Sequence, residues 1–199
     1  MYKIPAKSFR TEETIKRSKF IASLAHADSE ADAKAYISRV KNEFPDASHN
    51  CWAYVVGPPG DSSHVGMSDD GEPHGTAGKP MLTVLLHSGI GEIVAVVSRY
   101  FGGTKLGTGG LVRAYSDSVK TALAGLALKE KKEVITLIAI FDYARVAPIK
   151  QVIESMNAQI TAEEYTANVA FTIEVPKNKE TDFVRNLTNL TGGDIRITR

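Results

Sequence analysis

Residues 93–115 read IVAVVSRYFGGTKLGTGGLVRAY, an apolar run followed by a glycine-rich loop and the start of an amphipathic pattern. Half of the ten residues from Phe101 to Gly110 are glycine. Glycine lets a backbone adopt positive φ and approach a ligand closely, and the first turn of a helix offers unpaired N–H groups. The segment therefore predicts a strand at 93–100, an anion-binding loop, and a helix from Leu111 to about Lys129.

The charge of this segment agrees with an anionic ligand. It contains Arg99, Lys105 and Arg113, and no acidic residue occurs between Ile93 and Ser116. The glycine spacing matches neither the GxxxxGK[ST] phosphate loop nor the GxGxxG dinucleotide motif. A phosphate group or a nucleic-acid backbone is the expected ligand, and a turn that serves only packing is the alternative.

Working toward the N-terminus, hydrophobic periodicity predicts four more elements and one long loop. A capping box at Ser29–Asp32 begins a helix that Pro45 ends. Pro80 suits the first turn of a short helix, and Gly89 suits its end. The expected elements are a strand at 19–27, a helix at 30–44, a strand at 51–56, a polar loop at 57–77 and a helix at 80–87.

Toward the C-terminus, the charged segment Lys129–Glu133 separates a second complete pattern from the first. This second pattern has the order βαββαβ, which is typical of a ferredoxin-like domain. Its expected elements are strands at 134–140, 159–166, 168–175 and 195–197, with helices at 143–157 and about 180–191. We therefore predict an α+β protein with two domains, residues 1–130 and residues 134–199.

Composition limits the functional classes. The 199 residues are 43% hydrophobic, and 24 Lys and Arg face 23 Asp and Glu, so any nucleic-acid binding must rest on local patches. Six basic residues against two acidic ones in the first twenty form either such a patch or a solvated edge. Cys51 is the single cysteine, which excludes an intrachain disulfide. Without an apolar leader or a membrane-length run, we expect a cytoplasmic protein with no membrane association.

An acidic loop precedes the glycine loop. Asp69, Asp70 and Glu72, flanked by His64 and His74, have the oxygen ligands that a hard divalent cation prefers. Their spacing matches no established metal loop, and the same carboxylates serve to cap backbone N–H groups or to pair with Arg99 and Arg113. We expect no metal and no cofactor, and the pairing of these acids stays open at this point.

A second helix N-terminus is expected after Thr76-Ala-Gly-Lys79, which would bring Lys79 toward the glycine loop. Tyr100 and Phe101, at the start of that loop, are the best placed aromatic residues for stacking on a base. Trp52 and Tyr54 share one strand face and are expected in the core. The candidate residues for binding nucleic acid or phosphate are Lys79, Arg99, Tyr100, Gly102, Gly103, Lys105, Gly107, Gly109, Gly110 and Arg113.

Several long strings resemble the IMPACT (UPF0029) family in its two-domain bacterial form. They are SKFIA at 18–22, SHNCWAY at 48–54, SDDGEPHGTAGKP at 68–80, SRYFGG at 98–103 and LGTGGLVRAY at 106–115. One departure is His74, where the family pattern has a small residue. The resemblance implies a first domain like domain 2 of ribosomal protein S5 and a second like the last domain of the translocation factor EF-G.

The resemblance also implies a function. Eukaryotic members of the family restrain a kinase of translational control by binding its activator through a separate N-terminal domain, and bacterial-type members are proposed to bind nucleic acid. We therefore expect a non-catalytic protein that binds RNA or the ribosome, with a protein partner in translation control possible and the oligomeric state open. The alternative is a small-molecule enzyme or a phosphate-ligand binder that uses the loop at 101–110.

Overall fold

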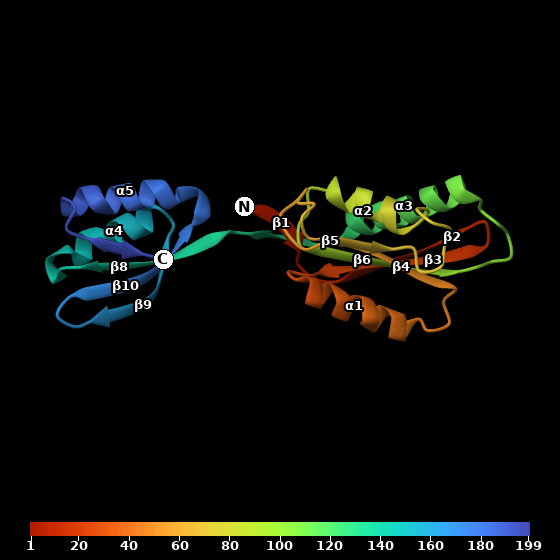
Figure 1. Ribbon diagram of the computed structural model, residues 1–199, viewed down its shortest axis with the longest axis horizontal. Helices are drawn as coiled ribbons and strands as arrows, with labels where there is room; N and C mark the ends of the chain where they lie inside the picture. The colour runs from red at the N-terminus through yellow and green to blue at the C-terminus, as the bar shows by residue number, and fades with distance from the viewer. The chain divides into compact units, whose positions relative to one another are not determined.

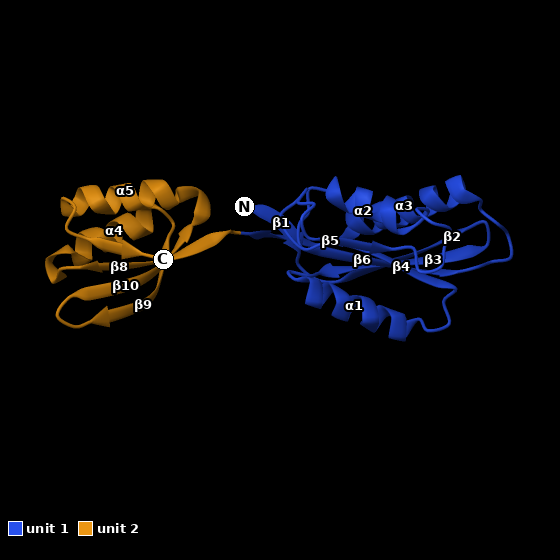
Figure 2. Cartoon of the chain, viewed as in Figure 1, with its two compact units in different colours: residues 1–131 blue, residues 132–199 orange.

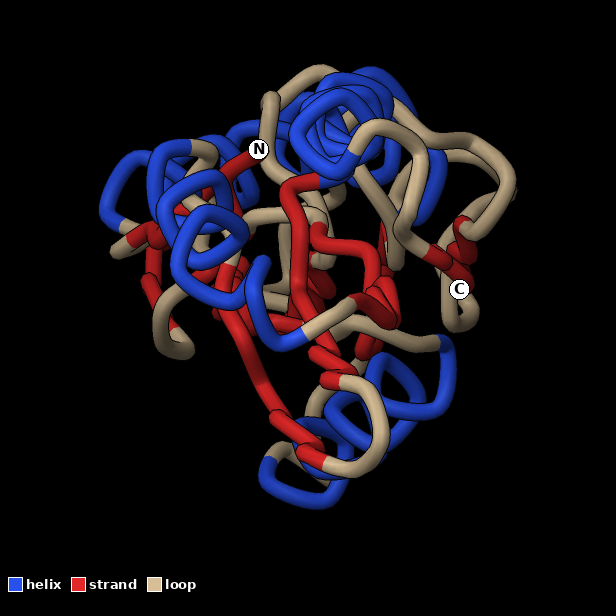
Figure 3. Tube along the Cα trace, turned by 90° about the vertical axis from the view of Figure 1, so that its left-hand side faces the viewer, coloured by secondary structure: helices blue, strands red, loops and turns tan.

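The structure is a computed structural model that describes residues 1–199. The chain forms two compact units, Met1–Lys131 and Lys132–Arg199, which are coloured separately in Figure 2. The division falls inside the charged segment 129–133. Helix, strand and loop can be followed along the Cα trace in Figure 3.

The first unit is built on a five-stranded antiparallel sheet with the order β2-β3-β6-β4-β5. Its central strand is buried along almost its whole length, because helices cover both faces of the sheet. This double burial explains why residues 93–97 are uniformly apolar rather than alternating. The strands are β2 (Phe9–Ile15), β3 (Ser18–His26), β4 (His49–Val55), β5 (Val65–Ser68) and β6 (Ile93–Tyr100).

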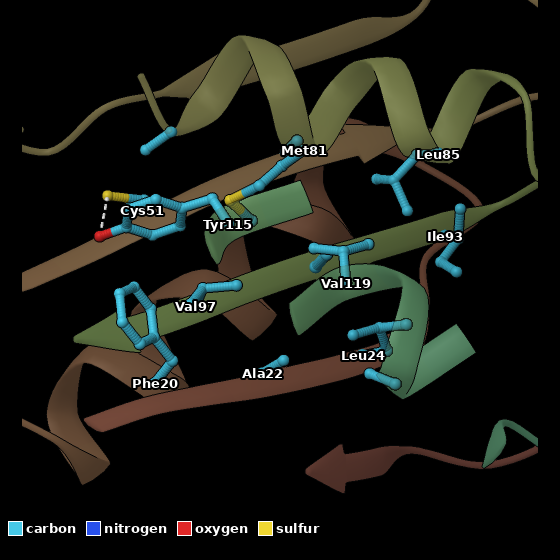
Figure 4. Close-up of a cluster of buried hydrophobic side chains, with 14 of the residues drawn as sticks. Phe20, Ala22, Leu24, Cys51, Met81, Leu85, Ile93, Val97, Tyr115 and Val119 are labelled. Carbon is cyan, nitrogen blue, oxygen red and sulfur yellow. Dashed lines mark hydrogen bonds between the residues drawn. The ribbon is translucent and has the colours of Figure 1, made fainter. Parts of the chain in front are cut away.

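One helix covers one face of this sheet and two helices cover the other (Figure 1). Helix α1 (Glu30–Glu43) packs on the face that carries Tyr54, against which Trp52 stacks with ring centroids 5.8 Å apart. Helices α2 (Gly78–Leu86) and α3 (Thr108–Gly125) pack on the opposite face. Figure 4 shows the core of that second face, in which the side chains of Phe20, Leu24, Met81, Leu85, Tyr115 and Val119 converge.

Several elements of this unit differ from the sequence-based expectation, which contained neither β1 nor β2. Glycine at position 125 leaves room for the Phe9 ring, which would lie 2.5 Å from an added Cβ. The helix ends at this residue and not at about Lys129, because Leu126 is already extended and the chain continues into a strand. That strand, β7 (Leu128–Lys131), pairs antiparallel with β1 (Tyr2–Pro5). Its sequence, LKEK, has no apolar alternation, so only the pairing reveals it. The polar loop expected at 57–77 contains the edge strand β5.

A buried carboxylate ties the β1–β7 ribbon to the rest of the unit. Glu92 is 4% exposed and accepts hydrogen bonds from the Tyr2 hydroxyl (2.7 Å) and from Lys131 Nζ (2.5 Å). His26 Nε2 lies 2.8 Å from the other carboxylate oxygen. Lys131 is therefore held in the first unit and is not part of an open linker.

The second unit has the predicted ferredoxin-like order. Its antiparallel sheet has the strand order β11-β8-β10-β9, and α4 and α5 cover one face (Figure 1). Alternate residues of β10, from Val169 to Val175, are buried under these helices, as period-2 patterning requires. The elements are β8 (Val134–Phe141), α4 (Val146–Ser155), β9 (Gln159–Tyr165), β10 (Val169–Pro176), α5 (Glu180–Thr191) and β11 (Arg196–Thr198), with short 3-10 turns at Tyr143–Arg145 and Lys177–Lys179. The predicted α+β fold class is confirmed.

None of the helices in the structure combines the length and the hydrophobicity that crossing a lipid bilayer requires.

We predict that residues 132–199, expressed alone, fold cooperatively. This segment has a separate buried core that includes Phe141, Ile149, Phe171 and Phe183, and domains of this size are often stable without a partner. Circular dichroism during urea denaturation measures this directly. A fragment without a sigmoidal transition would show that the second unit needs the first in order to fold.

Candidate phosphate and nucleic-acid site

Three hydrogen bonds to two other segments of the chain fix the start of the glycine loop. The Tyr100 hydroxyl donates to Asp46 (2.7 Å), the Phe101 N–H donates to Ser48 Oγ (3.1 Å), and the Gly102 N–H donates to Ser18 Oγ (3.3 Å). A side chain at Gly102 would collide with the carbonyl group of Arg17, so glycine is needed there for a close approach of two backbones. Phe101 itself remains 49% exposed at the surface of the unit.

The loop ends at the N-terminus of α3, which no side chain caps. Gly107 is the N-cap residue with φ +77°, a left-handed conformation that glycine adopts without strain. Its carbonyl accepts the first helical hydrogen bond from the Leu111 N–H at 2.9 Å. The N–H groups of Thr108, Gly109 and Gly110 belong to the first turn and have no partner within the helix. This end of α3 thus offers backbone donors and the positive end of a helix dipole.

The N-terminus of α2 has the opposite arrangement. Asp69 Oδ1 accepts from the Ala77 N–H (3.0 Å) and the Gly78 N–H (2.8 Å), and Oδ2 accepts from the Gly75 N–H (2.8 Å). The expected second free helix end is therefore wrong, because a carboxylate of the protein already occupies it. Lys79 is exposed on α2 and lines a groove between α2 and α3, together with Val112 and Lys120.

The three acids of the loop have three different sets of partners. Asp69 caps α2, and Asp70 accepts from Lys41 Nζ (2.6 Å) and from the Asn50 N–H (2.7 Å). Glu72 Oε1 accepts from Arg99 Nη1 (2.6 Å) and from the Tyr115 hydroxyl (2.7 Å). These acids therefore cap backbone N–H groups and form ion pairs, as one of the two interpretations of the sequence proposed. No three His, Cys, Asp or Glu side chains lie together in a group that could hold a metal ion.

Arg99 and Arg113 differ in exposure and in partners. Arg99 is 5% exposed, and its Cζ lies 5.6 Å from the ring centroids of both Phe20 and Phe101. Its Nη2 donates to Ser18 Oγ (3.3 Å), and its Nε is buried without a hydrogen-bond partner. For Arg99, the structure therefore agrees with the alternative of an internal ion pair with the acidic loop. Arg113 lies exposed on α3 and does not pair with the acidic loop.

A pocket of about 380 Å³ lies between the glycine loop and the acidic loop. Glu72 and Arg99 supply its buried polar groups, His49 is half-buried, and Lys105 and the first turn of α3 supply exposed groups. Its apolar walls are Pro73, Phe101, Leu106 and Leu111.

His49 is a pocket residue that the sequence analysis did not single out. Its Nδ1 lies 2.9 Å from the carbonyl oxygen of Asp70. A carbonyl oxygen only accepts, so Nδ1 carries a proton, and in the neutral ring Nε2 presents a lone pair. Nε2 lies 3.9 Å from Glu72 Oε2. In the sequence, His49 is only a polar residue at the start of a strand. It becomes part of a site because the acidic loop folds against it.

The remaining candidates are dispersed around this pocket. Gly103 has φ +83°, as a glycine turn predicts, whereas Gly109 and Gly110 lie inside α3. His74 points outward with a fully exposed side chain, 3.8 Å from Asp69. Of the candidate residues, the pocket brings together Arg99, Lys105 and Gly107, and it leaves out Lys79, Tyr100, Gly102, Gly103, Gly109, Gly110 and Arg113.

Comparison with known proteins agrees with this architecture. Residues 16–123 match the Impact N-terminal domain, which covers both loops of the pocket. The chain belongs to the IMPACT family. Residues 140–194 match a second domain, described only as a domain of unknown function (DUF1949).

IMPACT family members of known sequence align over nearly the whole chain. IMPACT family member YigZ of Escherichia coli (strain K12) is 42% identical over 98% of this chain and 95% of its own length. An IMPACT family member of Haemophilus influenzae is 41% identical, with the same coverage of both chains. A solved crystal structure of a hypothetical protein matches with a TM-score of 0.72 and 42% identity, over 98% of this chain and 95% of that one.

Replacing Gly107 with alanine should destabilise the first unit by about 1 kcal/mol, because alanine is strained at positive φ. Gly109→Ala is the matched control, since Gly109 lies in the helix and an added methyl group there meets nothing within 4 Å. Fluorescence of Trp52, the single tryptophan, reports unfolding of this unit in urea. Equal stability of the two variants would contradict a strained loop at Gly107.

The capping role of Asp69 predicts a pH dependence. Burial raises the pKa of Asp69, but hydrogen bonds from three backbone N–H groups outweigh burial and hold the pKa below its usual range. A lowered folded pKa stabilises the protein above the unfolded value of about 3.9, and this contribution is lost as pH falls toward the folded pKa. We expect Asp69→Asn to lower stability at pH 7 and to flatten the loss of stability below about pH 4.

Asp117→Asn is the control, since Asp117 makes only a surface ion pair with Lys120. The same Trp52 fluorescence measurement serves at each pH. If Asp69→Asn loses stability at low pH as steeply as the parent protein, the Asp69 cap is not the source of the pH dependence.

Proposed function

We propose that this protein binds RNA, alone or in the ribosome, and acts in the cytoplasm in the control of translation without catalysing a reaction. The observation that carries the proposal is the uncapped N-terminus of α3, which follows a loop with an exposed cation and an exposed aromatic ring. Lys105 and Phe101 are both exposed there. Backbone N–H groups, lysine and an aromatic ring are the groups that bind the phosphates and the bases of a single strand.

A neighbouring turn adds two more cations. Lys16 and Arg17 form the two-residue loop of the β2–β3 hairpin, between the paired residues Ile15 and Ser18. Both have positive φ, +46° and +68°. Such turns favour Asn-Gly, and non-glycine residues held in this conformation cost of order 1–3 kcal/mol each. Because Gly102 packs against the Arg17 carbonyl, this strained basic turn lies directly beside the glycine loop.

Strain of this kind supports a role in binding. A hairpin selected for stability alone would carry Asn-Gly, whereas this one displays two long cationic side chains at the edge of an anion-binding loop. The local charge is positive although the chain as a whole is nearly neutral, with a formal net charge of +1. An RNA backbone, with a phosphate at every nucleotide, is long enough to reach the hairpin turn and the helix end together.

The translational part of the proposal rests on the IMPACT resemblance. A protein partner in translation control is part of the same proposal. The competing function is that of a phosphate-ligand binder or a small-molecule enzyme. The pocket beside the loop is the observation that favours it, and mutation of the surface outside that pocket separates the two functions.

We predict that affinity for single-stranded RNA falls steeply with salt, with a log-log slope of about −0.7 per phosphate neutralised. Lys105→Ala and Arg113→Ala should each weaken binding by a similar factor for unrelated RNA sequences and reduce the slope. Lys34→Ala is the control, since Lys34 lies on α1, on the other face of the sheet. Fluorescence anisotropy with labelled RNA measures all of these. Affinity that ignores salt would exclude phosphate contacts.

The hairpin supplies the sharper variant. Lys16→Asn combined with Arg17→Gly replaces the strained turn with the favoured one, so the protein should become more stable while its affinity for RNA falls. If the turn has only a structural role, the double variant gains stability and its affinity for RNA does not change. That result would show that the turn is not part of the RNA-binding surface.

A further inference from the structure

The pocket beside the glycine loop has one carboxylate oxygen without a hydrogen bond. Glu72 Oε1 accepts from both Arg99 and Tyr115, whereas Oε2 has only His49 Nε2 near it, at 3.9 Å. The Glu72 side chain is 3% exposed, and it lines the pocket. Its Oε2 atom can therefore accept a hydrogen bond from a ligand in the pocket, and hydrogen bonds to a charged group are among the stronger ones.

The neighbouring histidine strengthens the same requirement. Because the Asp70 carbonyl holds the proton on His49 Nδ1, the Nε2 atom of the neutral ring is a second acceptor facing Glu72 Oε2. Two acceptors facing each other at this distance leave room for hydrogen-bond donors from a third group. An amino group, with two hydrogens on one nitrogen, satisfies both.

The rest of the pocket fits a flat ring with an attached anion. Phe101 and Leu106 supply an aromatic and an aliphatic wall, and Arg99 lies against the Phe101 ring at 5.6 Å. Lys105 and the first turn of α3 supply the cationic lining. A volume of about 380 Å³ is sufficient for a base with its sugar.

We infer that this pocket binds one unpaired nucleotide of an RNA strand, and that it prefers a base with an amino group on its edge. The base stacks on Phe101 and donates its amino hydrogens to Glu72 Oε2 and His49 Nε2. The phosphate lies at the N-terminus of α3, near Lys105. The inference rests on the proposed RNA-binding function and names the part of the RNA that enters the protein.

Cytidine and uridine monophosphate are the matched pair of probes, since cytosine carries an amino donor where uracil carries a carbonyl acceptor. Isothermal titration calorimetry of the full chain should give affinity for cytidine monophosphate at least about tenfold above that for uridine monophosphate, because the uracil carbonyl would face two acceptors. Inorganic phosphate should bind at least about tenfold more weakly than cytidine monophosphate, since it gains no stacking.

Two variants test the contacts of the base and of the phosphate separately. Phe101→Ala should weaken cytidine monophosphate at least about fivefold and leave inorganic phosphate unchanged. Lys105→Ala should weaken both ligands. Tyr143→Ala, at an exposed aromatic residue of the second unit, is the control and should change neither. Amide NMR shifts on titration should include Thr108, Gly109 and Gly110.

The outcomes separate this inference from the proposed function. Equal affinity for the two nucleotides, or an unchanged affinity in Phe101→Ala, would overturn the nucleotide pocket, while salt-dependent RNA binding would still support the surface around it. Selective binding of cytidine monophosphate by a protein that binds no RNA would overturn the RNA proposal and identify the pocket as a site for a free nucleotide.

Discussion

The buried ion pair between Glu72 and Arg99 is the interaction on which the candidate site depends. It joins the acidic loop to the end of β6 with a contact of 2.6 Å, between side chains that are both almost fully buried. Removing either partner would leave an uncompensated charge in the protein interior, which typically costs about 3–5 kcal/mol. The pair therefore determines where the acidic loop lies, and through Asp69 in the same loop it also determines how α2 begins.

The polar network continues into the hydrophobic core. Tyr115 donates to Glu72, and Cys51 Sγ donates to the Tyr115 hydroxyl at 3.3 Å, as the dashed line in Figure 4 marks. Burial raises the pKa of the Cys51 thiol to about 12, so this cysteine remains protonated and inert at neutral pH. Burial likewise raises the pKa of Tyr115, which keeps its hydroxyl available as a donor. A rigid core thus supports one side of a pocket whose other side is an exposed loop.

The two helix N-termini of the first unit show how the same chemistry serves stability and binding. Asp69 satisfies the N-terminus of α2, whereas the N-terminus of α3 begins at a glycine with no side-chain cap. Glycine at position 107 adopts the positive φ without strain, and it leaves no side-chain acceptor at the place where an anion is proposed to bind. The turn at Lys16 and Arg17 likewise has a strained backbone that lowers stability, and it displays two cations beside the proposed binding loop.

The sequence by itself determined the two α+β patterns and the strand and helix around the glycine loop. Of the three loop glycines for which the sequence suggests a positive φ, Gly103 and Gly107 have one, whereas Gly109 is helical. These features follow from local preferences, since periodicity and glycine content act within a few residues. Tertiary structure alone decided that Arg99 is buried against Glu72, that Asp69 blocks α2, and that β7 pairs with β1. It also decided that His49 faces Glu72 across a pocket. Each of these depends on contacts between segments more than 20 residues apart in the sequence or on an exact loop path, and no local pattern encodes which of several acids a given arginine will meet.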